Sequence, residues 1–249
     1  MCRNEKKRHT KSIILTLLLI SFSALLLGGC GGGSDGNPNG PGPAPGPDPA
    51  SKPKTAMEAW EGTWSGTGSA SALVDQGEGE GTSTTSITVN SLVIKKGTRA
   101  GDAMTFTLNG NGELNNQGTM AGTVTMKDVE FYMIGAEQAS GDISVSAIEV
   151  GKKGSVTINI PGKNPMTLNL QEMNEPLKDD FTRPLIFTSK GLSYEAESNK
   201  DGTSGSGQIE VILSGNTMDI TGTGSGESSE DVSQGSLKNG NMKITLTRK

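Results

Sequence analysis

The sequence predicts an all-β domain over residues 57–249, preceded by a leader and a linker. Three observations favour this fold class. Apolar and polar residues alternate with a period of two over most of the domain, as in half-buried antiparallel strands. Threonine, valine and isoleucine fill these runs, which suits a pleated surface. Turn-forming residues separate the runs about every 8–15 residues.

The chain begins with a basic segment followed by an uncharged apolar run. Residues 1–11 contain five basic residues and one acidic residue, and residues 12–29 contain no charge. This order is typical of an export signal. The run also approaches the roughly 18 residues that a membrane-spanning helix needs, so an uncleaved anchor is the competing interpretation.

The apolar run ends in Leu27-Gly28-Gly29-Cys30. These residues resemble the lipobox of bacterial lipoproteins, in which a leucine and two small residues precede a cysteine. The resemblance implies that residues 1–29 are a signal peptide and that Cys30 carries a diacylglycerol on its sulfur. A disulfide is disfavoured because residues 31–249 contain no cysteine. Gly31 follows Cys30 in place of aspartate, and this favours the outer membrane of the bacterial cell envelope.

Residues 30–56 form the predicted tether. Positions 31–56 contain seven glycines and seven prolines. Such a composition buries too little surface to offset the entropy of ordering, so we expect a chain without a packed core. Proline favours extended polyproline II structure, and the segment could span up to about 80 Å at roughly 3.1 Å per residue. A spacer is expected, and a proline-rich ligand for a partner domain is the alternative.

Charge and histidine content exclude several functional classes. The chain has 22 basic and 27 acidic residues, and removal of the leader leaves 17 and 26, a net charge of −9. A nucleic-acid partner is therefore not expected. The single histidine, His9, lies in the leader. Residues 30–249 thus cannot form Ser-His-Asp, Cys-His or histidine–zinc sites, and we expect no catalysis, cofactor or metal.

Eight to ten short antiparallel strands are expected in the domain, as a single β-barrel or, alternatively, a β-sandwich. Turn signals include Asn109-Gly110, Asn111-Gly112, Pro161-Gly162 and Ser214-Gly215-Asn216. A turn or two of helix is allowed only in Asp128–Ala139 and Gln171–Asp180. The alternating runs are residues 60–68, 87–94, 104–108, 119–126, 143–150, 156–160, 166–170, 185–187, 192–196, 209–213, 218–220 and 242–246.

The two ends of the domain favour the barrel. Trp60, Gly62 and Trp64 stand at even spacing in the first expected strand. The Gly-x-Trp of Gly62 and Trp64 resembles the first-strand signature of the calycin group, which includes lipocalins, fatty-acid-binding proteins and avidins. That resemblance implies a basic residue late in the chain across the tryptophan at the closed end of the barrel. Arg248 continues the inward row of the last strand and could stack on Trp64.

Carboxylate clusters are the remaining candidates for chemistry. Glu172, Glu175, Asp179 and Asp180 lie in a stretch without alternation, and a glycosidase would need two such groups about 5–9.5 Å apart. Glu227, Glu230 and Asp231 could bind calcium, although their spacing does not match an EF-hand loop. Glu78 and Glu80 form a further acidic pair. Solvated loops and hairpin tips are the simpler interpretation of all three clusters.

These observations predict a lipid-anchored, non-catalytic protein of the bacterial envelope. Its partners would be the membrane, through Cys30, and either a small apolar ligand inside the barrel or an envelope or host macromolecule at its loops. The ligand hypothesis rests on the analogy of fold alone. A carbohydrate-active hydrolase that uses the paired carboxylates and a purely structural surface protein are the alternatives.

Overall fold

A computed structural model describes residues 54–75, 80–116, 119–173, 177–200, 203–228 and 235–249. This part of the chain is almost entirely antiparallel β-structure, as the sequence predicts. Its elements are α2 (Ala56–Trp60), β1 (Gly62–Asp75), β2 (Glu80–Lys96), β3 (Asp102–Asn116), β4 (Thr119–Glu137), β5 (Ile143–Val150), β6 (Ser155–Asn159), β7 (Met166–Asn169), the 3-10 helix η1 (Leu170–Glu172), β8 (Leu177–Phe187), β9 (Gly191–Lys200), β10 (Thr203–Ser214), β11 (Thr217–Ser228) and β12 (Gly235–Arg248).

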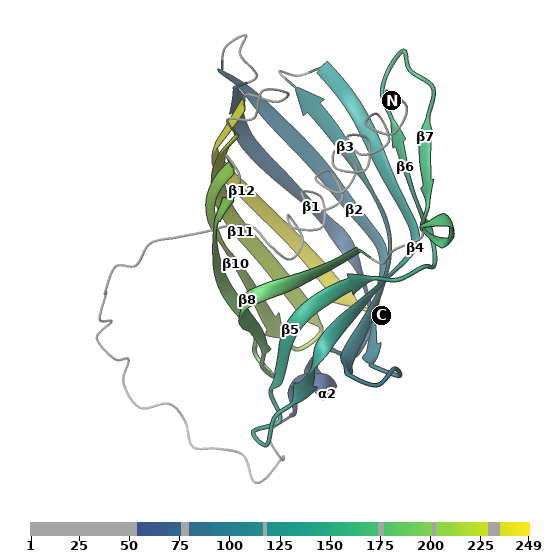
Figure 1. Cartoon of the computed structure of the whole chain (residues 1–249), viewed down its shortest axis with the longest axis vertical. Coiled ribbons are helices and arrows are strands. Elements are labelled where there is room, and N and C mark those ends of the chain that lie inside the picture. The colour runs from purple at the N-terminus through teal and green to yellow at the C-terminus, as the bar shows by residue number, and fades with distance from the viewer. Residues whose placement is uncertain (1–53, 76–79, 117–118, 174–176, 201–202, 229–234) are drawn as a thin grey trace, which may run out of the picture.

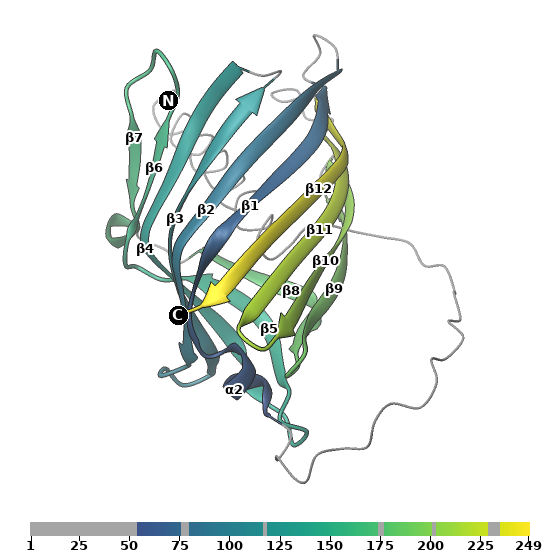
Figure 2. The ribbon, with the colours of Figure 1, turned by 180° about the vertical axis from the view of Figure 1, so that it is seen from behind.

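All twelve strands belong to one sheet that curves into a trough (Figure 1). The order along the sheet is β7-β6-β4-β3-β2-β1-β12-β11-β10-β9, and β5 pairs with both β4 and β8 beside this path. Figure 2 shows the trough from behind, with β1 and β12 side by side and the C-terminus near α2. Among the described strands no ladder joins β9 to β7 or β8, so the sheet is not closed.

Strand β4 has different neighbours along its two parts, and this divides the trough. Thr123–Lys127 pair with β6, whereas Phe131–Glu137 pair with β5. The change occurs around Asp128, whose φ is 51°. Gly154 is required beside it, since its φ is +90° and a Cβ there would lie 2.4 Å from the Asp128 carbonyl oxygen. We call the part of the trough level with α2, β5 and β8 the packed half, and the part level with β6 and β7 the open half (Figure 1).

The largest buried side chains lie in the packed half. Strands β3 and β4 supply Phe106 and Phe131, which are 2% and 1% exposed. Val129 and Met133, on the same face of β4 as Phe131, are also fully buried. An alternating row of apolar residues is buried here because α2, β5 and β8 cover the inner face of the sheet.

Two expectations about helices are wrong. Trp60 lies in helix α2 and not in the first strand, because Thr55 and Glu58 form a capping box that starts a short helix. Asp128–Ala139 is strand up to Glu137, since the alternation of buried residues in this segment extends β4. In the stretch Gln171–Asp180, the expected turn of helix is limited to the end of η1, and β8 begins at Leu177.

The strands are longer and more numerous than expected. Asn109-Gly110 and Asn111-Gly112 lie inside β3 and make no turn. Gly110 serves close packing there, because a Cβ would lie 2.6 Å from the Thr88 carbonyl oxygen. Turns do occur at Pro161-Gly162 and at Gly215-Asn216, as predicted. The described residues form twelve strands where eight to ten were expected, because each of the twelve alternating runs pairs as a strand of its own.

Candidate binding face

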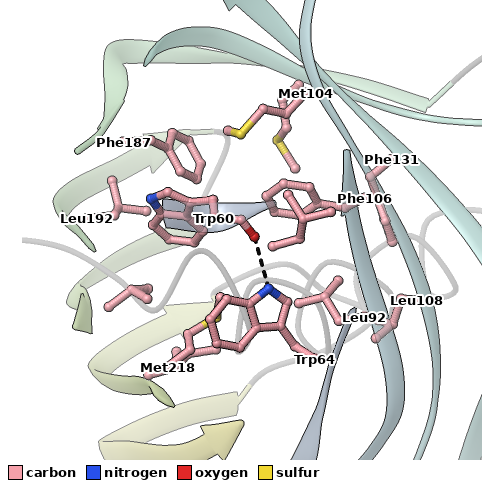
Figure 3. Packing of buried hydrophobic residues seen from close by; sticks show 14 of the residues in the cluster. Trp60, Trp64, Leu92, Met104, Phe106, Leu108, Phe131, Phe187, Leu192 and Met218 are labelled. Atoms are coloured by element: carbon pink, nitrogen blue, oxygen red, sulfur yellow. Dashed lines mark hydrogen bonds between the residues drawn. The ribbon is translucent and has the colours of Figure 1, made fainter. Parts of the chain in front are cut away.

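Two tryptophans close the lower end of the packed half. Trp60 lies on α2 and Trp64 on β1, and both are fully buried. The indole Nε1 of Trp64 donates to the carbonyl oxygen of Trp60 at 2.9 Å, and the Nε1 of Trp60 donates to that of Thr188 at 2.9 Å. Trp60 also meets Phe187 edge to face, with ring centroids 4.8 Å apart (Figure 3). Helix α2 is thereby fixed across the end of the trough.

The structure brings Gly62, Trp64 and Arg248 together at this end. Trp64 and Arg248 are directly opposite on β1 and β12. The guanidinium carbon of Arg248 lies 4.5 Å from the centroid of the Trp64 ring, and its Nη2 donates to the carbonyl oxygen of Ala59. Gly62 has a φ of +141°, and a Cβ there would lie 3.4 Å from Arg248. The arginine thus ties the last strand to both α2 and β1.

Apolar side chains continue along the inner face into the open half, and they become more exposed toward the rim. Along β6 and the residue after it, the exposed fraction rises from 1% at Val156 to 9% at Ile158 and 42% at Ile160. On β7, Met166 is opposite Ile158 and is 37% exposed. We call this surface the inner apolar face; its members are Leu114, Val124, Ile158, Ile160, Met166 and Leu168.

This face is the main exposed apolar surface of the described residues. Five large apolar side chains are exposed in the described part of the chain, and three of them, Leu114, Ile160 and Met166, belong to the inner apolar face. The other two, Ile186 and Ile212, lie apart from it on β8 and β10. Clustered exposed apolar residues mark interaction sites more often than scattered ones do.

The opposite wall of the open half is lined by glycine. Gly207, Gly224 and Gly240 form one row across β10, β11 and β12. Gly205 pairs with Gly226 in the next row toward the rim, and Gly222 lies opposite the buried Ile209 and Met242. We call these six residues the glycine wall. The six glycines stand at inward positions of their strands and have no side chains. The glycine wall therefore faces the apolar side chains across the trough with its backbone alone.

A polar network fastens β3, β4 and β5 on the outer surface of the packed half. Arg99 donates to Asp102 at 2.8 Å and to Glu149 at 2.7 Å, and its guanidinium carbon lies 3.5 Å from the centroid of the Tyr132 ring. The Tyr132 hydroxyl donates to Glu130. The sequence does not predict this network, because Arg99 lies in the connection between β2 and β3 and its partners lie on β3, β4 and β5, so no local motif marks them.

These contacts shift two pKa values in the network. The pKa of Arg99 is raised, mainly by its hydrogen bonds to Asp102. The pKa of Tyr132 is raised to about 12, first by burial and then by the hydrogen bond to Glu130. Both shifts favour the protonated forms in the folded protein. The charged groups of the network pair with one another. We therefore interpret the network as a contact that holds neighbouring strands together on the outer surface.

The carboxylates that the sequence singles out occupy separate places. Glu172 is exposed at the end of η1 and accepts a hydrogen bond from Asn169 at 3.1 Å. Asp179 and Asp180 are opposite Ile148 and Ala147 in the β5–β8 ladder. Glu80 begins β2, and Glu227 is opposite Ser236. The remaining candidates lie outside the described residues; they are Glu78, Glu175, Glu230 and Asp231.

Comparison with protein-family models, with curated proteins and with solved structures gives no match. Within the described ranges, no group of three or more histidine, cysteine, aspartate or glutamate residues is placed to hold a metal ion. None of the helices in the described part of the chain is long and apolar enough to span a membrane. Cys30 and residues 31–53 of the predicted tether lie outside these ranges. The last residues of the predicted tether belong to the folded domain instead, because Thr55 caps α2 and Ala56 is its first, buried residue.

Proposed function

We propose that this protein is a lipoprotein of the bacterial cell envelope, anchored through Cys30, whose β domain binds a partner without catalysis. The lipobox-like residues Leu27–Cys30 support the anchor. Two or more acyl chains hold a protein stably at a membrane, and the tether would let the domain stand away from it. The outer membrane is the favoured location.

The inner apolar face carries the proposal for binding. Its exposed residues Leu114, Ile160 and Met166 gather on one surface, whereas the packed half is occupied by its own side chains. A partner that covered this face would remove apolar area from water at about 25 cal/mol per Å². An envelope or host macromolecule fits an open trough better than a small ligand enclosed in a barrel. The absence of histidine from residues 30–249 supports a non-catalytic role.

Mass spectrometry of the N-terminus tests the anchor. The chain is expressed with its leader in a bacterium that processes lipoproteins. We expect the membrane-bound form to begin at Cys30 and to carry the mass of a diacylglycerol. The Cys30→Ala variant should keep its leader and lack the lipid. An unmodified Cys30 or a retained leader in the unaltered chain would refute the lipoprotein proposal.

Nile red, an uncharged dye that fluoresces in apolar surroundings, tests the binding face. We expect residues 31–249 to bind it, and we expect Met166→Ser and Leu114→Ser to reduce the fluorescence. Ile212→Ser is the matched control, since Ile212 is 50% exposed but lies apart on β10. Equal losses from all three variants, with circular dichroism unchanged, would contradict the proposed face.

A further inference from the structure

We propose that the open half binds an extended peptide segment of a partner protein, which adds to β9 as a strand and alternates large apolar with basic residues. This inference rests on the proposed function, because it names the partner of the same face. Three features support it: the free edge of β9, the glycine wall opposite the inner apolar face, and the acidic outer surface beside that edge.

In the described part of the chain, no strand pairs with the outer edge of β9 beyond Gly191. Gly191 exchanges backbone hydrogen bonds with Thr188, at 2.8 and 3.3 Å, so its N–H and C=O point away from β10. Backbone direction alternates along a strand, so the same groups of Ser193, Glu195 and Glu197 also point away from β10. In the described chain, β9 forms a ladder with β10 alone. Lipids cannot satisfy a row of amides, whereas an added strand can.

The glycine wall leaves room for the inward side chains of such a strand. A Cβ placed on Gly205 would make only ordinary contacts, the nearest at 3.5 Å. Gly205 pairs with Ser198 of β9, so the inward side chains of an added strand would enter beside the glycine wall and face Leu114, Ile160 and Met166 across the trough. One strand would therefore cover the apolar residues and pair with the free edge at the same time.

Charged residues on the outer face of β9 and β10 indicate which residues the peptide would carry at its outward positions. Glu195 and Glu210 are exposed on the neighbouring strands β9 and β10. Basic residues opposite them would be favourable, and acidic residues would be unfavourable. A second copy of β9 would bring glutamates together and is disfavoured. The chain's own residues 31–53 are also unsuitable, because their prolines lack N–H groups and they contain no large aliphatic or aromatic side chain.

Fluorescence anisotropy with synthetic decapeptides tests the inference on residues 31–249. One peptide alternates isoleucine with lysine, a second has the same composition in two blocks, and a third replaces lysine by glutamate. We expect the alternating basic peptide to bind at least about tenfold more tightly than either of the others. Hydrogen exchange should show that it protects the amides of Glu195 and Glu197.

Two matched pairs of variants locate the added strand. Glu195→Pro removes an edge amide without breaking the β10 ladder and should weaken binding about tenfold or more, whereas Glu195→Gln should weaken it about threefold or less. Gly205→Leu fills the trough and should abolish binding. Ser204→Leu adds the same side chain at the adjacent exposed position and should leave binding unchanged.

The outcomes separate this inference from the proposed function. If Nile red binds at the inner apolar face but the peptides bind equally or not at all, the strand inference is wrong and the face remains a binding site. If phospholipid vesicles displace Nile red and the alternating peptide does not, the partner is a lipid and the strand inference is wrong. If neither dye nor peptide binds, both proposals fail.

Discussion

The packed and open halves are built from the same long strands but bury very different side chains. In the packed half, β3 contributes Phe106 and Leu108, which are 2% and 3% exposed. In the open half the same strand contributes Gly112 and then Leu114, which is 36% exposed. The alternation is the same in both halves. What differs is the presence of α2, β5 and β8 over one of them.

This comparison shows that a strand and a hydrophobic core have different requirements. Period-two alternation and backbone pairing extend each long strand through both halves. A core needs a second layer of side chains, and in the packed half the aromatic contacts of Trp60 with Phe187 and of Phe187 with Phe106 supply it. We therefore expect substitutions in the packed half to affect stability and those in the open half to affect binding.

The largest expected loss of stability follows substitution of Trp64. Trp64→Ala removes a fully buried indole and its hydrogen bond to Trp60, and it should lower the free energy of unfolding by about 3–5 kcal/mol. Urea unfolding followed by circular dichroism measures the change. Trp64→Phe keeps much of the volume and should cost less. A loss below about 1 kcal/mol for the alanine variant would mean that this end is not the stable part of the domain.

Leu108 and Leu114 offer a matched pair on one strand. Leu108→Ala should lower the free energy of unfolding by about 2–5 kcal/mol, because it leaves a cavity among buried residues. Leu114→Ala should change it by about 0.5 kcal/mol or less, since the side chain is already partly in water. Thermal and urea unfolding both report the difference. Equal losses would contradict the division into a packed and an open half.

Arg248, at the end of the packed half, should contribute less to the free energy of unfolding than Trp64 or Leu108. Arg248→Met keeps the aliphatic stem but loses the cation over Trp64 and the donor to Ala59, so the free energy of unfolding should fall by about 0.5–2 kcal/mol. Arg248→Lys keeps the charge without the planar guanidinium and should recover only part of the loss. Full recovery by lysine would show that charge alone matters there.

The outer network gives the smallest effect, a contribution to stability that is lost only at high pH. The pKa of Tyr132 is about 12 in the folded protein against an ordinary value of 10.0, so folding favours the protonated phenol. Its stabilising contribution is complete below pH 10 and is lost as the pH rises from about 10 to 12. The stability difference between the unaltered chain and Tyr132→Phe should shrink across this window, as followed by urea unfolding. A constant difference would rule out this linkage.

Much of the fold could be predicted because strand formation depends on local pattern. The alternation in residues 104–108 and 242–246 predicted strands that form, and both lie inside longer ones. Glycine was harder to interpret, because Asn109-Gly110 and Asn111-Gly112 were predicted to be turns. Gly110 instead lies within β3, where the close approach of the Thr88 backbone leaves no room for a Cβ. That approach depends on partners far away in the sequence.

The sequence by itself determined the strand-rich class of the domain, its acidic charge, the absence of histidine after His9 and the presence of the lipobox-like residues Leu27–Cys30. These are properties of composition and of neighbouring residues. Only the tertiary structure decided that β4 changes partner near Asp128 and that one end of the trough is covered while the other is open. These features arise from pairing between distant segments, and local alternation contains no information about which segments pair.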